Sequence, residues 1–147
     1  PFIARDDPGA PIKMLRVLRR GGALGIPMDL RSRVRSVGVP FLGADSPTVK
    51  GPATLALRAH SPVVVATLEP MGPHAMEAML PRHLALTVTR IPTDDLSRRS
   101  ADDERELTRR LAEELSRRIM RMPVGWPWMH RRRERLTPED GGDTLGA

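Results

Sequence analysis

The residues best suited to chemistry stand near the end of the chain, where aromatic and cationic side chains are grouped. Trp126 and Trp128 are the only tryptophans, and they directly precede His130, Arg131 and Arg132. Aromatic rings suit a lipid–water boundary, and neighbouring positive charge suits an anionic lipid or a phosphorylated headgroup. We expect the three basic residues either to bind a headgroup phosphate or to pair with acidic groups. We interpret both tryptophans as packing residues.

Two more candidates for substrate binding stand beside short apolar runs. The planar guanidinium of Arg5 could hold a phosphate, or it could form a surface ion pair with Asp6 or Asp7. Asp29 ends the apolar run 23–28, and site residues of α/β sheets gather at such strand ends. A simple turn-capping role is the alternative for Asp29.

The middle of the sequence offers weaker candidates. Arg31, Arg33 and Arg35 could line a site for a lipid phosphate, although a solvated basic loop is the safer interpretation. Thr48 and Gly51 could begin a helix near the substrate, and a plain helix cap is an equal alternative.

Several chemistries find no support in the residue types. Cysteine is absent, which excludes disulfides and thiolate catalysis. His60, His74 and His83 lack the spacing of metal ligands, and we expect neither a metal nor another cofactor.

Length and charge limit the number of domains and the kind of partner that the chain can have. With 147 residues the chain is long enough for one domain with its own core. The net charge of +6 favours a partner that carries phosphate, and the surplus lies within residues 1–92. No apolar run reaches the roughly 18–20 residues that span a bilayer. Because the sequence opens on Pro1, we expect a fragment of a longer protein.

The periodicity of apolar residues predicts an α/β fold in which a mixed sheet is flanked by helices. We expect a single domain over residues 1–132 and a flexible polar tail over 133–147. The near-continuous β-branched run of residues 62–68 indicates a strand buried on both faces. The other elements expected are strands over 2–4, 23–28, 37–42 and 83–91, a turn over 43–47, a helix over 48–59, and a helix that begins after the turn 6–9, has Pro11 in its first turn and ends at the glycine pair 21–22. A last helix is expected to begin at a Ser100 cap, with acidic residues in its first turn and arginines in its last. Its apolar stripe, which we assign to the core, is Leu107, Leu111, Leu115 and Ile119.

Five short blocks follow one another over most of the chain. They are Phe2-Ile3-Ala4-Arg5, Gly25-Ile26-Pro27-Met28-Asp29, Gly38-Val39-Pro40-Phe41-Leu42-Gly43, Thr48 with Gly51, residues 55–58 and the strand 62–66, and Trp126 to Arg132. In this order and spacing they resemble the late acyltransferases of lipid A biosynthesis, within the lysophospholipid acyltransferase superfamily. Two positions depart from that pattern: Leu30 follows the aspartate where a polar residue is usual, and Arg133 replaces an aromatic residue.

The resemblance implies transfer of a fatty acyl group from an acyl-carrier thioester to a hydroxyl of a lipid A precursor or a similar glycolipid. It implies acyl carrier protein or acyl-CoA as donor, a glycolipid acceptor, an anionic membrane surface as partner, and a place at the cytoplasmic face of the bacterial inner membrane. It also implies a role for Arg5 in binding phosphate.

The superfamily's catalytic block is a histidine with an acidic residue five positions later. None of the four histidines here has one, since Val65, Met79, Val88 and Arg135 stand at those positions. The family's order of blocks places that histidine before Phe2, so we expect this fragment to be inactive alone.

Two non-catalytic alternatives remain: a basic nucleic-acid-binding module and a module that binds anionic membranes. An aromatic content of 3% with no tyrosine leaves few platforms for stacking bases, and we expect no nucleic-acid partner.

Overall fold

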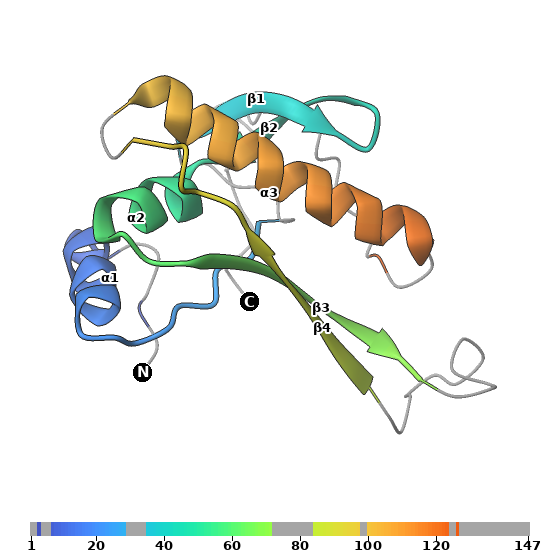
Figure 1. The fold of residues 1–147 in the computed structure, drawn as a ribbon, viewed down its shortest axis with the longest axis horizontal. Helices are drawn as coiled ribbons and strands as arrows, with labels where there is room; N and C mark the ends of the chain where they lie inside the picture. The colour runs from blue at the N-terminus through green and yellow to red at the C-terminus, as the bar shows by residue number, and fades with distance from the viewer. Residues whose placement is uncertain are drawn as a thin grey trace, which may run out of the picture.

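The described part of the chain forms three helices and two pairs of strands, so the predicted α/β class is confirmed (Figure 1). The computed structural model describes residues 3, 7–28, 35–71, 84–97, 100–123 and 126. The predicted strand 2–4 lies almost wholly outside these residues, and the predicted tail 133–147 lies entirely outside them. In chain order the elements are α1 (Ala10–Arg19), β1 (Ser36–Phe41), β2 (Ala44–Val49), α2 (Gly51–Ala59), β3 (Val63–Pro70), β4 (Leu84–Ile91) and α3 (Ala101–Arg121).

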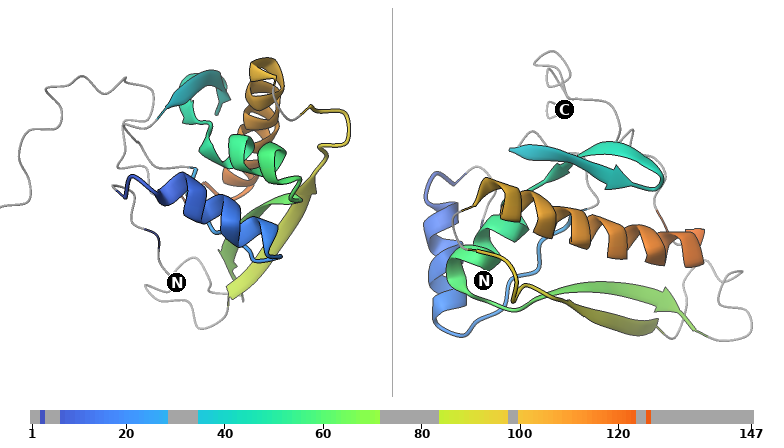
Figure 2. Two further views of the ribbon diagram at one scale, coloured as in Figure 1. Left: turned by 90° about the vertical axis from the view of Figure 1, so that its left-hand side faces the viewer. Right: turned by 45° about the horizontal axis from the view of Figure 1, so that its top comes forward.

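Helix α3 forms the middle layer, with the β1–β2 pair on one side and the β3–β4 pair on the other (Figure 2). Its start is capped as the sequence predicts, because the Ser100 hydroxyl oxygen accepts a hydrogen bond from the Asp103 amide. The predicted stripe of Leu107, Leu111 and Ile119 is buried. The half-buried Leu115 packs against both hydrophobic clusters, and α3 therefore joins the two halves of the core.

The described strands form two separate antiparallel pairs in place of the single mixed sheet that the sequence suggests. β1 and β2 are joined by a turn at Leu42 and Gly43, both with positive φ (50° and 79°). Positive φ at both central residues is the backbone of a type I′ hairpin turn. The predicted turn over 43–47 is therefore too long, because residues 44–49 pair with β1. The predicted helix over 48–59 accordingly begins later, at Gly51.

The β3–β4 pair, which we call the ribbon, differs from its predicted environment. Its inner face packs toward α3, while alternate side chains on the outer face are exposed. The expectation of burial on both faces of 62–68 is thus wrong: Leu68 is 64% exposed, as is Leu86 opposite it at 63%. A β-branched run reports strand propensity, but what covers a strand depends on distant parts of the chain.

Helix α1 ends where the sequence predicts, at the glycine pair 21–22. Gly21 adopts φ 78°, and the Gly22 amide donates to the Val17 carbonyl, which closes the helix with a left-handed residue. α1 lies beside α2 (Figure 1). The segment 23–28 that follows is not a strand. It runs extended beside the core, and Met28 packs against the buried cluster of α2, β3 and α3.

Candidate functional site

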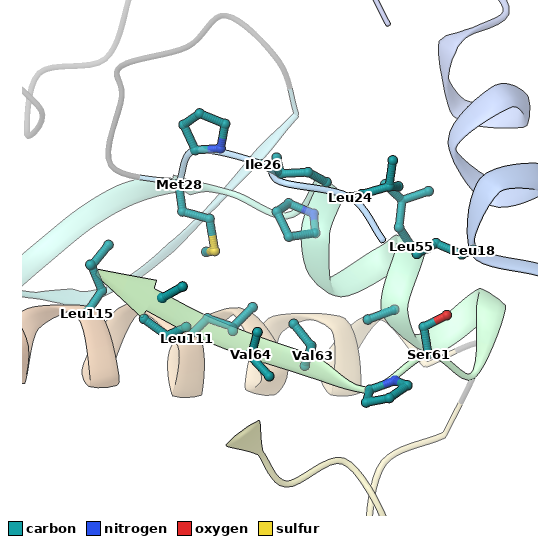
Figure 3. Close-up of a pocket in the computed structure, with 16 residues that line it drawn as sticks. Leu18, Leu24, Ile26, Met28, Leu55, Ser61, Val63, Val64, Leu111 and Leu115 are labelled. Carbon is teal, nitrogen blue, oxygen red and sulfur yellow. The ribbon is translucent and has the colours of Figure 1, made fainter. Parts of the chain in front are cut away.

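A pocket of about 240 Å³ opens between α1, α2, β3, α3 and the segment 23–28. Met28 faces Leu111 and Leu115 across it, and Leu18 meets Leu55 at its other end (Figure 3). Among the described lining residues Ser61 alone has a polar side chain; the others are Leu24, Ile26, Pro27, Pro52, Ala56, Pro62, Val63, Val64, Val65 and Ala66. We call this space the apolar pocket.

The chemistry of the apolar pocket follows from its walls. Because none of the described residues that line it carries a charged side chain, an ion would lose hydration against these walls without gaining a partner. A hydrocarbon chain would instead remove apolar surface from water on both sides, worth about 25 cal/mol per Å². The pocket can therefore bind an alkyl or acyl chain, and its described walls carry no acidic, basic or histidine side chain.

Each wall has a local reason for its place. The Leu111 and Leu115 side chains point to the pocket from the stripe of α3, four residues apart on one helical face. α2 is fixed to α3 near its start, because the Lys50 ammonium pairs with the Glu104 carboxylate at 3.0 Å. The glycine pair that ends α1 turns the chain into the segment 23–28, which closes the pocket on the side of Met28.

The structure describes three of the predicted substrate-binding residues, Arg35, Thr48 and Gly51, of which the buried one is Thr48. This residue lies in β2, fully buried, and its hydroxyl donates to the Ser46 carbonyl at 3.3 Å. α2 has its N-cap at Lys50, so the predicted capping role of Thr48 is not the one it has here. Gly51 is the first residue of α2, and the exposed Arg35 precedes β1, where its carbonyl accepts a hydrogen bond from the Lys50 amide at 3.3 Å. The remaining candidates lie outside the described residues; they are Arg5, Asp29, Arg31, Arg33, His130, Arg131 and Arg132.

A buried arginine under the ribbon escaped the sequence analysis. The Arg118 guanidinium, 4% exposed as a residue, donates to the Glu114 carboxylate at 2.8 Å and to the Thr67 hydroxyl at 2.8 Å. It also donates to the Thr87 carbonyl at 2.7 Å and the Thr89 hydroxyl at 2.6 Å. The signal was available, since position 118 is one heptad after Leu111 and so lies within the apolar stripe.

On the outer face of α3, arginines and carboxylates neutralise one another. Hydrogen bonds from Arg109 and then Arg110 lower the pKa of Glu106 to about 2. Arg110 likewise lowers the pKa of Asp95 to about 2, because its guanidinium donates hydrogen bonds to both carboxylate oxygens, at 2.8 and 2.5 Å. These carboxylates stay ionised throughout the physiological range, so they are poor candidates for an acid or base.

The described residues offer neither a metal site nor a membrane-spanning helix. In that part of the chain no group of three histidine, cysteine or acidic side chains could hold a metal ion. None of the helices described is both long and apolar enough to cross a bilayer.

Comparison with known proteins adds one finding. Residues 3–134 match the family described as bacterial lipid A biosynthesis acyltransferase. No curated protein and no solved structure matches the chain. The match begins before α1 and continues past α3, so it takes in every element that forms the apolar pocket.

Proposed function

Because this chain belongs to the bacterial lipid A biosynthesis acyltransferases, we propose that it serves the transfer of a fatty acyl group from an acyl-carrier thioester to a hydroxyl of a lipid A precursor. The acceptor oxygen attacks the thioester carbonyl carbon and loses its proton to a base. The tetrahedral intermediate then expels the thiolate, which takes up a proton, and an ester remains.

The apolar pocket is the observation that carries this proposal within the chain. An acyl donor brings a long hydrocarbon chain that must be held while its carbonyl reacts. Binding this chain lowers the entropic part of the activation free energy, because the thioester is already positioned when the reaction begins. The described walls supply such a surface from five segments of the fold. Asp29 is the next residue in the chain after Met28, which lines the pocket, and this supports the proposed role of Asp29 in substrate binding.

Phosphate groups of the acceptor would be held by the arginines that match the family's blocks. We assign this role to Arg5 and to the run of His130, Arg131 and Arg132, since a guanidinium binds phosphate oxygens in a fork of two hydrogen bonds. Arg31 would contribute further positive charge. The base is assigned to a histidine–carboxylate block that the 147 residues do not contain.

A lipid acceptor places the reaction at a membrane surface, and we propose the cytoplasmic face of the bacterial inner membrane. The net charge of +6 supports attraction to anionic headgroups. Measured release of the chain from vesicles as salt is raised would test this part separately.

Narrowing the pocket tests the acyl-binding role. In the intact protein, Ile26→Trp should shift the preference toward shorter acyl chains, since Ile26 lines the pocket and is partly exposed. Ile12→Trp is the matched control, because Ile12 is 63% exposed on α1 and does not line the pocket. Competition between thioesters of different chain length gives the ratio of kcat/KM values. An unchanged ratio in Ile26→Trp would contradict the proposal that the apolar pocket binds the acyl chain.

A further inference from the structure

One face of α1 carries positive charge that the described part of the protein does not balance. Lys13, Arg16, Arg19 and Arg20 are all exposed, and their spacing of three and four residues groups them on one side of the helix. Lys13 forms an ion pair with Asp7. Within the described ranges no acidic side chain pairs with the remaining three. We call Arg16, Arg19 and Arg20 the α1 arginine face.

Arginine content alone does not explain this face, as α3 demonstrates. That helix carries six arginines and six acidic residues, and its outer arginines are engaged by its own carboxylates. α1 has no acidic residue in its first turn or elsewhere. A cluster of one sign on a surface attracts oppositely charged partners and speeds their association. The α1 arginine face is therefore suited to an anionic partner.

The opposite side of the same helix leads to the apolar pocket. Leu18 lines the pocket near Leu24 and Leu55 (Figure 3), and Ala10 is buried. A partner seated on the α1 arginine face would be within one helix diameter of the pocket, about 10 Å. This arrangement suits a partner that brings a chain for the pocket to take up.

We propose that the α1 arginine face docks an acidic carrier protein that presents carboxylates on a helix and delivers the acyl chain as a thioester. The proposal rests on the acyl-transfer function proposed above. The three arginines span positions 16 to 20, a little over one turn and so about 6–8 Å long. A patch of this length matches the exposed carboxylates on one helix of a partner.

A lipid surface is the competing partner, and the fold favours it less. A helix that binds membranes directs a continuous row of apolar side chains into the lipid. In α1, Ala10 is buried and Leu18 lines the pocket, and Ile12 is the one large apolar side chain of this helix that is mostly exposed. The exposed apolar side chains of the ribbon extend to its free end, away from α1 (Figure 1). Most of the large exposed apolar side chains thus lie on the ribbon and not beside the α1 arginine face, whereas a membrane-facing surface would combine the two.

The test compares two donors of the same acyl chain in the intact protein. One is lauroyl acyl carrier protein, and the other is the uncharged N-acetylcysteamine thioester of lauric acid, which has no carrier to dock. In R16E/R19E/R20E the KM for the carrier-linked donor should rise about tenfold or more relative to the KM for the small thioester, because reversed charge repels an acidic surface. Fluorescence anisotropy of labelled carrier protein should give the same loss of affinity without turnover.

The charge-matched control is R90E/R105E/R121E, which reverses three exposed arginines on β4 and α3. Its ratio of the two KM values should equal that of the unmodified protein. R16Q/R19Q/R20Q repeats the test with a smaller perturbation if the reversed variant fails to fold. Unchanged carrier affinity in both α1 variants would overturn the proposal. Loss of binding to phosphatidylglycerol vesicles, with carrier affinity intact, would also overturn it in favour of a lipid surface. If the unmodified protein uses neither donor, the proposed function fails, while the anisotropy measurement still decides the docking site.

Discussion

The guanidinium Nη2 of Arg118 on α3 lies 2.6 Å from the hydroxyl of Thr89 on β4. The same guanidinium reaches Thr67 on β3, so one buried side chain binds both strands of the ribbon to the helix. Few apolar side chains of the ribbon are buried, since Val65 and Ile91 are its buried hydrophobic residues among those described. Hydrogen bonds donated by the Arg118 guanidinium therefore attach to α3 the part of the ribbon that has few buried apolar side chains.

Removing this guanidinium should destabilise the fold. Arg118→Met keeps the length of the side chain but leaves Glu114 and the two threonine hydroxyls with a buried partner missing. Breaking a buried charged pair typically costs about 3–5 kcal/mol. Urea unfolding should detect a loss of that order. Arg117→Met is the control: Arg117 is exposed and pairs with the same Glu114, and exposed pairs contribute about 0–1 kcal/mol. Equal effects of both substitutions would contradict the role given to Arg118.

Stability should fall in acid through Glu114. Hydrogen bonds from Arg117, and further ones from Arg118 and Thr89, lower its pKa from 4.5 to about 2. A carboxylate whose pKa is lower in the folded state stabilises the fold above its unfolded pKa, and this contribution is lost as pH falls toward the folded pKa. The difference in unfolding free energy between the unmodified protein and Glu114→Gln should thus be constant at neutral pH and shrink between about pH 4.5 and about pH 2. A difference that does not change with pH would exclude this assignment.

The end of α1 depends on glycine at position 21. Gly21→Ala should destabilise by about 1 kcal/mol, because φ 78° is strained for a residue with a Cβ atom. Gly25→Ala is a suitable comparison, since Gly25 has no positive φ and open space around its Cβ position. Thermal unfolding followed by circular dichroism would measure both. Similar melting temperatures for the two variants would show that the left-handed turn is not required.

Shortening a side chain that belongs to both the apolar pocket and the core should destabilise the fold. Leu111 is 1% exposed and belongs to both, so Leu111→Ala should lower the free energy of unfolding by about 2–5 kcal/mol. Leu86→Ala removes the same atoms from the exposed face of the ribbon, where substitutions usually change stability by within about 0.5 kcal/mol. Chemical denaturation of the two variants gives the comparison. A loss at Leu86 as large as at Leu111 would reveal that the outer face of the ribbon is covered in solution.

The elements that could be predicted are those whose signals are local. Ser100, the leucine stripe and the terminal charges specify α3 within its own residues, and the glycine pair specifies the end of α1. Both strands of the ribbon were expected within two residues of their bounds. Capping, helical periodicity and β-branching act between neighbours in the chain, which explains why these predictions succeeded.

Other features were decided by contacts between distant residues. Leu42 adopts positive φ, and its amide donates a hydrogen bond to the Ser116 hydroxyl of α3, 74 positions away. Residues 44–49 form a strand because they pair with β1. The apolar pocket likewise draws its walls from five segments, none of which carries a motif for it.

From the sequence alone came the α/β class, the position of α3 and the family resemblance that residues 3–134 confirm. Tertiary structure alone decided that the strands form two antiparallel pairs, that Arg118 is buried and that the α1 arginine face backs onto an apolar pocket. The reason is that propensity, capping and charge can be read along the chain, whereas burial and strand partners depend on which distant residues pack together.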